Sequence, residues 1–284
     1  MRFEITAIGT GLALQDGGRV GWRRFGVPPG GALDRHAMGA ANRLVGNPPD
    51  APVLEVFRQG ACLRALESGW VGLAGAASCP NLAAWTARPV AAGERLEFSE
   101  KVVGVFSYLA VPGGFRAEHW FGSVSADPRN GLGRALAKGD LLEARGAPFR
   151  PFAERVAARQ INPEQRRAEV ASPEFLLLPG PQFEAFSAEA HGALVRGPWT
   201  VSPRSDRTGY RLEGPALQVP ESIASEPVIP GSFQVPGNGQ PIITMADGPT
   251  VGGYPKIAVL RDADVDRLAQ CAPGTQIDLR WADQ

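Results

Sequence analysis

Glycine and proline interrupt this sequence so often that few long regular elements fit between them. The 284 residues include 35 glycines and 26 prolines, and the apolar runs between them are short, for example RFEITAI, VLEVF, RLEF, PIITMAD, KIAVL and QIDLRW. Glycine favours turns and proline removes a backbone donor, so short apolar runs bounded by these residues are typical of β-strands. The sequence therefore predicts a mainly β protein, with strand lengths that suit barrels or sandwiches.

Two segments depart from this pattern and predict short helices. In ALDRHAMGAANRLVGN the apolar residues fall on one stripe, Asp34 stands at the N-cap position, and Gly46 and Asn47 end the run before two prolines. DADVDRLAQC predicts a shorter helix, with Asp262 or Asp264 as its cap. A third stretch, FAERVAARQINPEQRRAEVA, is polar and weakly periodic, so we interpret it as a linker.

Similar segments in the two halves predict two related domains. VLEVFRQGACL resembles RLEGPALQV, FSYLAVPGGF resembles ITMADGPTVGGY, and LAKGDLLEA resembles LAQCAPGTQIDL, in the same order along the chain. We expect an N-terminal β-barrel domain over residues 1–160 and a C-terminal one over residues 161–284, with the linker at about 152–172. The alternative is that glycine turns followed by short apolar strands look alike in any β protein.

Charge and hydropathy exclude several classes of partner. Lys plus Arg and Asp plus Glu are each 29, so no net charge attracts nucleic acid or an anionic membrane. No apolar run approaches the ~20 residues of a membrane-spanning helix, and the first residues lack the apolar core of a signal peptide. We therefore expect a cytoplasmic protein that binds neither nucleic acid nor membrane.

Cysteine and histidine give no sign of a metal site. The cysteines are Cys62, Cys79 and Cys271, and the histidines are His36, His119 and His191. Their spacings match no common ligand pattern, so the cysteines are interpreted as structural thiols and no bound metal is expected.

The stretch QDGGRVGWRRFGVPPGGALD combines six glycines with several charges, among them Asp16, Arg19, Arg23 and Arg24. Glycine allows positive φ and close approach of a ligand or another backbone, so a loop of this kind is suited to lining a pocket. A tight hairpin with solvated charges would have the same composition.

A second charged segment, VSPRSDRTGYRLEG, places guanidinium, carboxylate and hydroxyl groups on one turn. Its polar residues are Ser202, Arg204, Ser205, Asp206, Arg207 and Arg211. Arginine binds carboxylate or carbonyl oxygens in two-point contacts, and a neighbouring Asp can orient it or take a proton. A cluster of surface ion pairs is the alternative interpretation.

The third segment, VIPGSFQVPGNGQPIITMADGPTVGGYPKIAV, sets Gln234, Gln240, Asp247, Tyr254 and Lys256 among glycines and prolines. Proline stiffens the GGYP turn, and rigid turns carrying such groups are suited to holding a small polar substrate. The chain contains neither a GxxxxGK[ST] phosphate loop nor a GxSxG elbow. ATP binding by this chain alone and acyl-enzyme chemistry are therefore not expected.

These three segments, together with SYLAVPGGF and GLGRALAKGD, resemble the allophanate hydrolase subunit 2 family. That family includes C-type subunits of 5-oxoprolinase and the related biotin-dependent carboxyltransferase region of urea carboxylases. The resemblance runs from Gly9 to Leu279. It implies a pair of cyclophilin-like β-barrel domains, in line with the two domains expected from the repeated segments.

The resemblance also implies partners and a reaction. A 5-oxoprolinase of this kind uses ATP and Mg to open the lactam of 5-oxoproline to glutamate, with a subunit-B-type and a subunit-A-type protein. The chain would then be a hydrolase component, inactive without its partners, with the nucleotide held on one of them. One alternative is a carboxyltransferase component that moves CO2 from carboxybiotin to a urea-like or amide-like substrate. Another is a non-catalytic regulatory interaction protein.

Within the family-like motifs the resemblance suggests roles for eight residues. The catalytic candidates are Arg207 and Lys256 as oxyanion or carboxylate donors, Asp206 as the group orienting Arg207, and Asp34 and Asp247 as proton-handling carboxylates. The substrate-binding candidates are Gln234, Tyr254 and Arg19. Four positions depart from the family's usual residues: Gly30 for a serine, Val124 for an arginine, Thr208 for a methionine and Val251 for a threonine. The departures imply either a different substrate or a weakly active or regulatory relative.

Overall fold

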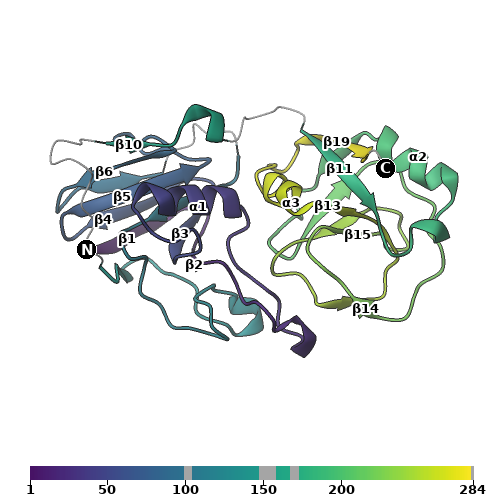
Figure 1. The fold of residues 1–284 in the computed structure, drawn as a ribbon, viewed down its shortest axis with the longest axis horizontal. Helices are drawn as coiled ribbons and strands as arrows, with labels where there is room; N and C mark the ends of the chain where they lie inside the picture. The colour runs from purple at the N-terminus through teal and green to yellow at the C-terminus, as the bar shows by residue number, and fades with distance from the viewer. Residues whose placement is uncertain (99–103, 147–157, 167–172, 283–284) are drawn as a thin grey trace. The chain divides into compact units, whose positions relative to one another are not determined.

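The computed structural model describes residues 1–98, 104–146, 158–166 and 173–282. Within these ranges the chain is mainly β, as the sequence predicted, and it contains three α-helices (Figure 1). It divides into two compact units, which are described separately. The first unit comprises Met1–Arg19 and Gly30–Glu169, and the second comprises Val20–Pro29 and Val170–Gln284.

The first unit contains two β-sheets. One has the strand order β7-β4-β1-β9, with β1 at Arg2–Ile8, β4 at Ala61–Ala65, β7 at Arg95–Glu97 and β9 at Leu141–Glu143. The other has the order β10-β6-β5-β8-β3-β2, with β2 at Leu12–Gln15, β3 at Val53–Phe57, β5 at Gly69–Gly75, β6 at Thr86–Val90, β8 at Phe106–Ala110 and β10 at Arg159–Gln160. One core cluster takes buried side chains from both sheets, including Phe3, Ile5, Leu54, Leu63, Val71 and Leu109.

Helix α1 (Arg35–Leu44) packs against β5 and β8 of the six-stranded sheet (Figure 1). Asp34 caps it as predicted, because its side chain accepts a hydrogen bond from the Ala37 amide at 3.0 Å. The helix lies close to the sheet at Gly72, where a Cβ would come within 2.7 Å of the Ala41 carbonyl oxygen. The apolar stripe seen in the sequence is the face that this packing buries.

The second unit is a closed barrel with the strand order β11-β18-β15-β16-β13-β12-β19. Its strands are β11 (Glu174–Pro179), β12 (Trp199–Val201), β13 (Gly209–Glu213), β15 (Ser232–Gln234), β16 (Ile242–Thr244), β18 (Lys256–Leu260) and β19 (Gln276–Trp281). A separate two-stranded ribbon pairs β14 (Glu226–Pro227) with β17 (Val251–Gly252). The buried core includes Phe175, Leu177, Trp199, Phe233, Ile243 and Ile257.

Two helices belong to the second unit. Helix α2 (Ala188–Arg196) was not predicted; Ser187 caps it by accepting from the Ala190 amide at 3.2 Å. Helix α3 (Asp262–Ala269) was predicted, but its cap was wrong. The N-cap is Arg261, without a side-chain cap bond, so Asp262 and Asp264 lie in the first turn, where carboxylates favour the helix dipole instead.

The two units share one run of four antiparallel strands. The order β2-β3-β8-β5 in the first unit corresponds to β12-β13-β16-β15 in the second, and these strands are paired antiparallel in both. Beyond this run the units differ, since β6 pairs with β5 whereas β18 pairs with β15. The shared run supports the repeat predicted from sequence, and duplication itself stays a prediction.

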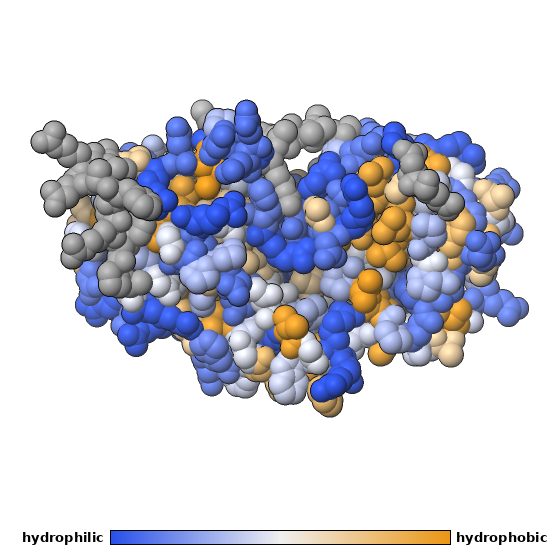
Figure 2. Space-filling model, viewed as in Figure 1, coloured by the Kyte–Doolittle hydropathy of each residue, from blue (hydrophilic) through white to orange (hydrophobic). Residues whose placement is uncertain are grey.

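Much of the predicted linker lies outside the described residues. Within residues 158–166, β10 pairs with β6 and a 3-10 turn covers Pro163–Gln165. On the face shown in Figure 2, hydrophobic residues occur in small groups among hydrophilic ones. Among the described helices, none has the length and hydropathy needed to span a bilayer.

Candidate functional site

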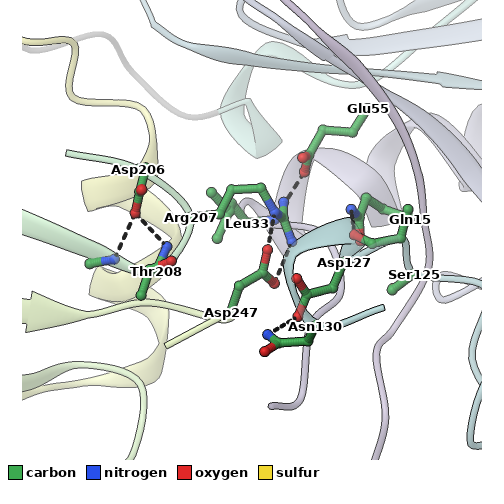
Figure 3. A network of polar contacts seen from close by, with 12 residues as sticks. Gln15, Leu33, Glu55, Ser125, Asp127, Asn130, Asp206, Arg207, Thr208 and Asp247 are labelled. Atoms are coloured by element: carbon green, nitrogen blue, oxygen red, sulfur yellow. Dashed lines mark hydrogen bonds and ion pairs between the residues drawn. The ribbon is translucent and has the colours of Figure 1, made fainter. Parts of the chain in front are cut away.

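The first part of the site is the turn between β12 and β13 of the second unit. Asp206 Oδ1 accepts hydrogen bonds from the amides of Thr208, at 2.8 Å, and Gly209, at 3.3 Å, and so shapes the turn. Arg207 projects from this turn toward Asp247, as Figure 3 shows. Its Nε donates to Asp247 Oδ2 at 2.6 Å and its Nη2 donates to Oδ1 at 3.0 Å. That Asp206 orients Arg207 stays a prediction; Asp247 holds the guanidinium in a two-point contact.

Two predicted residues, Gln234 and Lys256, lie opposite each other on β15 and β18. Both are buried. Gln234 Nε2 donates to Thr244 Oγ1 at 2.9 Å, which ties the end of β15 to the end of β16. At Gly252 a Cβ would lie 2.6 Å from Gln234 Oε1, so the β17 backbone approaches this amide more closely than a larger residue would allow.

Lys256 forms an ion pair with Glu226, which is on β14. Its Nζ lies 2.7 Å from Glu226 Oε1, and only 2% of the Lys256 side chain is exposed, against 35% for Glu226. Gln182 Nε2 also donates to Glu226 Oε1, at 2.9 Å, and Gln182 Oε1 accepts from the Lys256 amide at 3.1 Å. The hydrogen bond from Lys256, and then that from Gln182, lower the pKa of Glu226 from its ordinary value.

Sequence analysis missed both Glu226 and Gln182. Neither residue lies in a motif, and each gains its role through a contact with residues distant in sequence. Glu226 is brought to Lys256 by a ribbon of two residues per strand, which is too short for a periodic signal.

Short contacts join the Arg207 turn to the Gln234 amide. Asp247 N donates to the Arg207 carbonyl oxygen at 3.0 Å. At Gly248 a Cβ would lie 2.5 Å from Thr244 Cγ2 and 2.7 Å from the Thr208 carbonyl oxygen. Gly248 thus lets the loop after β16 pack against both parts of the site. Tyr254, another predicted binding residue, is 47% exposed at the surface of the same unit.

In the first unit, Asp16 is the centre of a buried hydrogen-bond network. Its Oδ1 accepts from the Gly18 amide and the Ser125 hydroxyl, both at 2.8 Å, and from the Ser123 hydroxyl at 2.5 Å. Its Oδ2 accepts from the Val124 amide at 2.8 Å. These bonds attach the glycine-rich stretch at residues 15–34 to the segment around Val124.

Arg19 lies three positions after Asp16 in the sequence and is buried, with 1% of its surface exposed. Its Nη2 donates to the Ser125 carbonyl oxygen. Gly30 provides the space for this guanidinium, because a Cβ there would lie 2.4 Å from Arg19 Nη1, and its φ of +62° also favours glycine. The departure from serine at Gly30 is therefore coupled sterically to the position of Arg19.

Asp34, predicted to handle protons, is 2% exposed and caps helix α1. Its amide donates to the Tyr108 hydroxyl at 2.8 Å, and that hydroxyl donates to Glu55 Oε2 at 2.9 Å. Glu55 also accepts from the Leu33 amide at 3.1 Å (Figure 3). Burial and the charge of Glu55 raise the pKa of Tyr108 well above its usual value. The local contacts give Asp34 a structural role.

Six of the eight predicted residues thus belong to the second unit, where contacts bring together Arg207 with Asp247 and Gln234 with Lys256. Arg19 and Asp34 belong to the first unit. In the parts of the chain that the structure describes, no three His, Cys, Asp or Glu side chains gather as they would around a metal ion.

Comparison with known proteins places this geometry among carboxyltransferase-like domains. The sequence matches the family described as carboxyltransferase domain, subdomain A and B, over residues 25–281. It is 38% identical to the C subunit of the 5-oxoprolinase of Escherichia coli K12, over 96% of this chain and 89% of that protein. It is 28% identical to the urea amidolyase of Lachancea kluyveri, over 97% of this chain and 16% of that protein.

Solved structures show the same fold. The crystal structure of TTHA0988 matches with a TM-score of 0.89 at 33% identity, covering 98% of this chain. The chain spans 55% of that solved chain. The urea amidolyase of K. lactis matches with a TM-score of 0.87 at 25% identity, over 99% of this chain and 19% of that protein.

Proposed function

The chain belongs to the carboxyltransferase domain family, and from this membership we propose that it is the C-type subunit of an ATP-dependent 5-oxoprolinase. The observation that carries the proposal is the match to the C subunit of the E. coli 5-oxoprolinase, which extends over 89% of that protein at 38% identity. The chain would be a hydrolase component that helps open the lactam of 5-oxoproline to glutamate.

The second unit offers groups suited to this chemistry. Opening a lactam requires donors that stabilise charge developing on the carbonyl oxygen and a group that manages the proton at the ring nitrogen. Arg207, whose side chain is 22% exposed, is held by Asp247 near the surface and supplies a planar donor. Lys256 lies beneath the surface, so it would reach a ligand only after a local rearrangement around Glu226.

The partners and the nucleotide are part of the same proposal. We place ATP and Mg on a subunit-A-type or subunit-B-type protein, because this sequence has no phosphate loop. The chain spans 55% of the TTHA0988 chain, which therefore carries a further region joined to the equivalent of this one. We propose that a separate partner subunit supplies such a region, so that this chain is part of a cytoplasmic, heteromeric enzyme of cyclophilin-like domains.

A carboxyltransferase component is the second candidate. The match to the urea amidolyase of L. kluyveri covers 97% of this chain, and it favours transfer of CO2 from carboxybiotin to a urea-like or amide-like substrate. Both candidates act on a C(=O)N group, so the residues of the site do not separate them.

Reconstitution tests the proposal. The chain is mixed with subunit-A-type and subunit-B-type proteins encoded by the same genome, and glutamate release from 5-oxoproline is measured with and without ATP. We expect glutamate only when all three proteins and ATP are present. Glutamate formed equally well without this chain would refute the proposal, and carboxylation of urea by a biotinylated carrier would establish the second candidate.

Calorimetry of the isolated chain with Mg-ATP tests the placement of the nucleotide. We expect no binding in the micromolar range, because the chain lacks a phosphate-binding loop before a helix. Micromolar affinity for the isolated chain would move the nucleotide site onto this subunit.

A further inference from the structure

One carboxylate at the site that a ligand can reach, Glu226, was not singled out by the sequence. Asp247 has a side chain that is 10% exposed, and both of its oxygens accept from Arg207. Asp34 belongs to the first unit and is used as a helix cap. Glu226, in contrast, has 35% of its side chain exposed while its carboxylate is firmly held.

The contacts of Glu226 fall on one of its two oxygens. Oε1 lies 2.7 Å from Lys256 Nζ and accepts from Gln182 Nε2 at 2.9 Å. Among the described residues, no hydrogen bond to Oε2 is present. A carboxylate oxygen has lone pairs for further donors, so Oε2 is available to accept from a ligand.

The ribbon that carries Glu226 also contacts the other buried polar group of the site. Glu226 pairs with Gly252 across β14 and β17. Gly252 lies against the Gln234 amide, where a Cβ would be 2.6 Å from Oε1. The ribbon therefore contacts Gln234 through Gly252 and Lys256 through Glu226. Glu226 is thus fixed at the site by backbone pairing as well as by its ion pair.

The neighbours of Glu226 determine the protonation state of its carboxylate. Lys256 and Gln182 lower its pKa, so the carboxylate stays ionised at neutral pH and is a poor proton donor. An ionised carboxylate accepts hydrogen bonds from N–H groups more strongly than a neutral acceptor does. This suits recognition of the N–H in a lactam or other amide-like substrate.

We propose that Glu226 is a substrate-binding residue whose Oε2 accepts a hydrogen bond from the N–H of the substrate, with Lys256 and Gln182 as positioning residues. No bond is made or broken in this step, and no proton is transferred. The inference rests on the proposed function, because it takes 5-oxoproline as the substrate.

A pair of ligands that differ only at the N–H tests the role. 5-Oxoproline is compared with 5-oxotetrahydrofuran-2-carboxylate, in which a ring oxygen replaces the N–H, by calorimetry on the assembled enzyme without ATP. The wild type should bind the lactam roughly tenfold or more tightly than the lactone, as expected for a charge-assisted hydrogen bond. Glu226→Gln places an amide N–H₂ beside the ligand, so this preference should disappear or reverse.

Controls separate recognition from folding and from the proposed function. Glu221→Gln changes an exposed glutamate five positions earlier and should leave the preference unchanged. If Glu226→Gln weakens binding of both rings equally, Glu226 only supports the fold and the inference is overturned. A wild type that prefers neither ring also overturns it, whereas a wild type that binds neither ring refutes the proposed function.

The positioning contact is tested on the isolated full chain, independently of turnover. Its lysines are Lys101, Lys138 and Lys256, so protein labelled with ¹³C at the lysine ε-carbon gives a simple spectrum. Lys256→Met assigns the signal. Glu226→Gln should shift the Lys256 signal and leave that of Lys138 in place. An unmoved Lys256 signal would remove the ion pair on which the inference depends.

Discussion

Asp247 holds Arg207 through two hydrogen bonds, at 2.6 Å and 3.0 Å, although the two residues are 40 positions apart. The contact joins the turn before β13 to the loop after β16. Because Nε and Nη2 both donate to the same carboxylate, the plane of the Arg207 guanidinium has a defined orientation. Fixed donors of this kind stabilise developing charge better than mobile ones.

Arg207→Lys should therefore reduce kcat/KM of the assembled enzyme while the chain still folds. Lysine keeps the charge but not the planar two-point contact, and the loss should be about 1–3 kcal/mol, or roughly 5- to 150-fold. Steady-state kinetics measure it. Arg204→Lys is the matched control, since that side chain is 76% exposed. Unchanged kinetics in Arg207→Lys would reassign the residue to a structural ion pair.

Acid should weaken the contribution of Glu94 to stability. Glu94 accepts from Arg88 and from the Ala91 amide, and the Arg88 contact is the main reason that its pKa is lowered. A lowered folded-state pKa contributes stability above the unfolded value of 4.5, and the contribution is lost as pH falls through the folded value. Both side chains are partly exposed, so about 0.5–1 kcal/mol is expected at pH 7.

Calorimetric unfolding of the full chain checks this. Glu94→Gln should lower the transition temperature of the first unit at pH 7 and have little effect at pH 3. Glu97→Gln, which alters an ion pair with both partners more than half exposed, should change little at either pH. A Glu94→Gln difference that grows on acidification would contradict the assignment.

The thiols of Cys79 and Cys271 should be unreactive in the native protein. Both are buried, and burial raises the pKa of each to about 12. The thiolate is the reactive form, so almost none is present at pH 8. Labelling with a thiol-specific disulfide reagent, mapped by mass spectrometry, should modify them only in denaturant. Modification of either within minutes in native buffer would show that its surroundings open readily.

The exposed aromatic pair in the glycine-rich stretch at residues 15–34 should contact the partner subunit. Trp22 and Phe25 are 36% and 62% exposed, with ring centroids 5.6 Å apart, so neither is a core residue. Aromatic and arginine side chains are enriched at interface centres, and Arg24 lies 4.8 Å from the Phe25 ring. Trp22→Ala and Phe25→Ala should each weaken the complex with a subunit-B-type protein.

Co-expression followed by size-exclusion chromatography measures the effect. Phe121→Ala, which removes another exposed aromatic at 43% exposure, serves as the control. If the wild-type chains elute separately at micromolar concentration, the partner prediction fails. If the complex survives both Trp22→Ala and Phe25→Ala, the interface lies elsewhere.

Local signals in the sequence predicted much of the fold. Glycine and proline spacing predicted the short strands, and Asp34 was predicted as the cap of helix α1 because capping depends on neighbours three residues away. Helix α2 was missed because only Ala190 and Leu194 are buried in it, too few for a clear stripe. The cap of α3 was wrong because backbone position, not residue type alone, decides which residue precedes the first turn.

Contacts between distant segments account for what the sequence could not show at the site. Gln234 and Lys256 were both candidates, but only strand register places them opposite each other. Asp206 is adjacent to Arg207 in sequence, yet its Oδ1 accepts from backbone amides of its own turn, and Asp247 supplies the two-point contact. Glu226 depends on a ribbon whose strands are two residues long.

The division of the chain into units has a consequence for its synthesis. Val20–Pro29 belongs to the second unit, whose remaining residues begin at Val170, so roughly 140 residues separate the two parts. At ~5–20 residues per second, a ribosome needs about 7–28 s to bridge that interval. During this time the exposed aromatic segment leaves the exit tunnel before the barrel to which it belongs has been translated. This segment is therefore open to nascent-chain proteolysis and chaperone capture in that window.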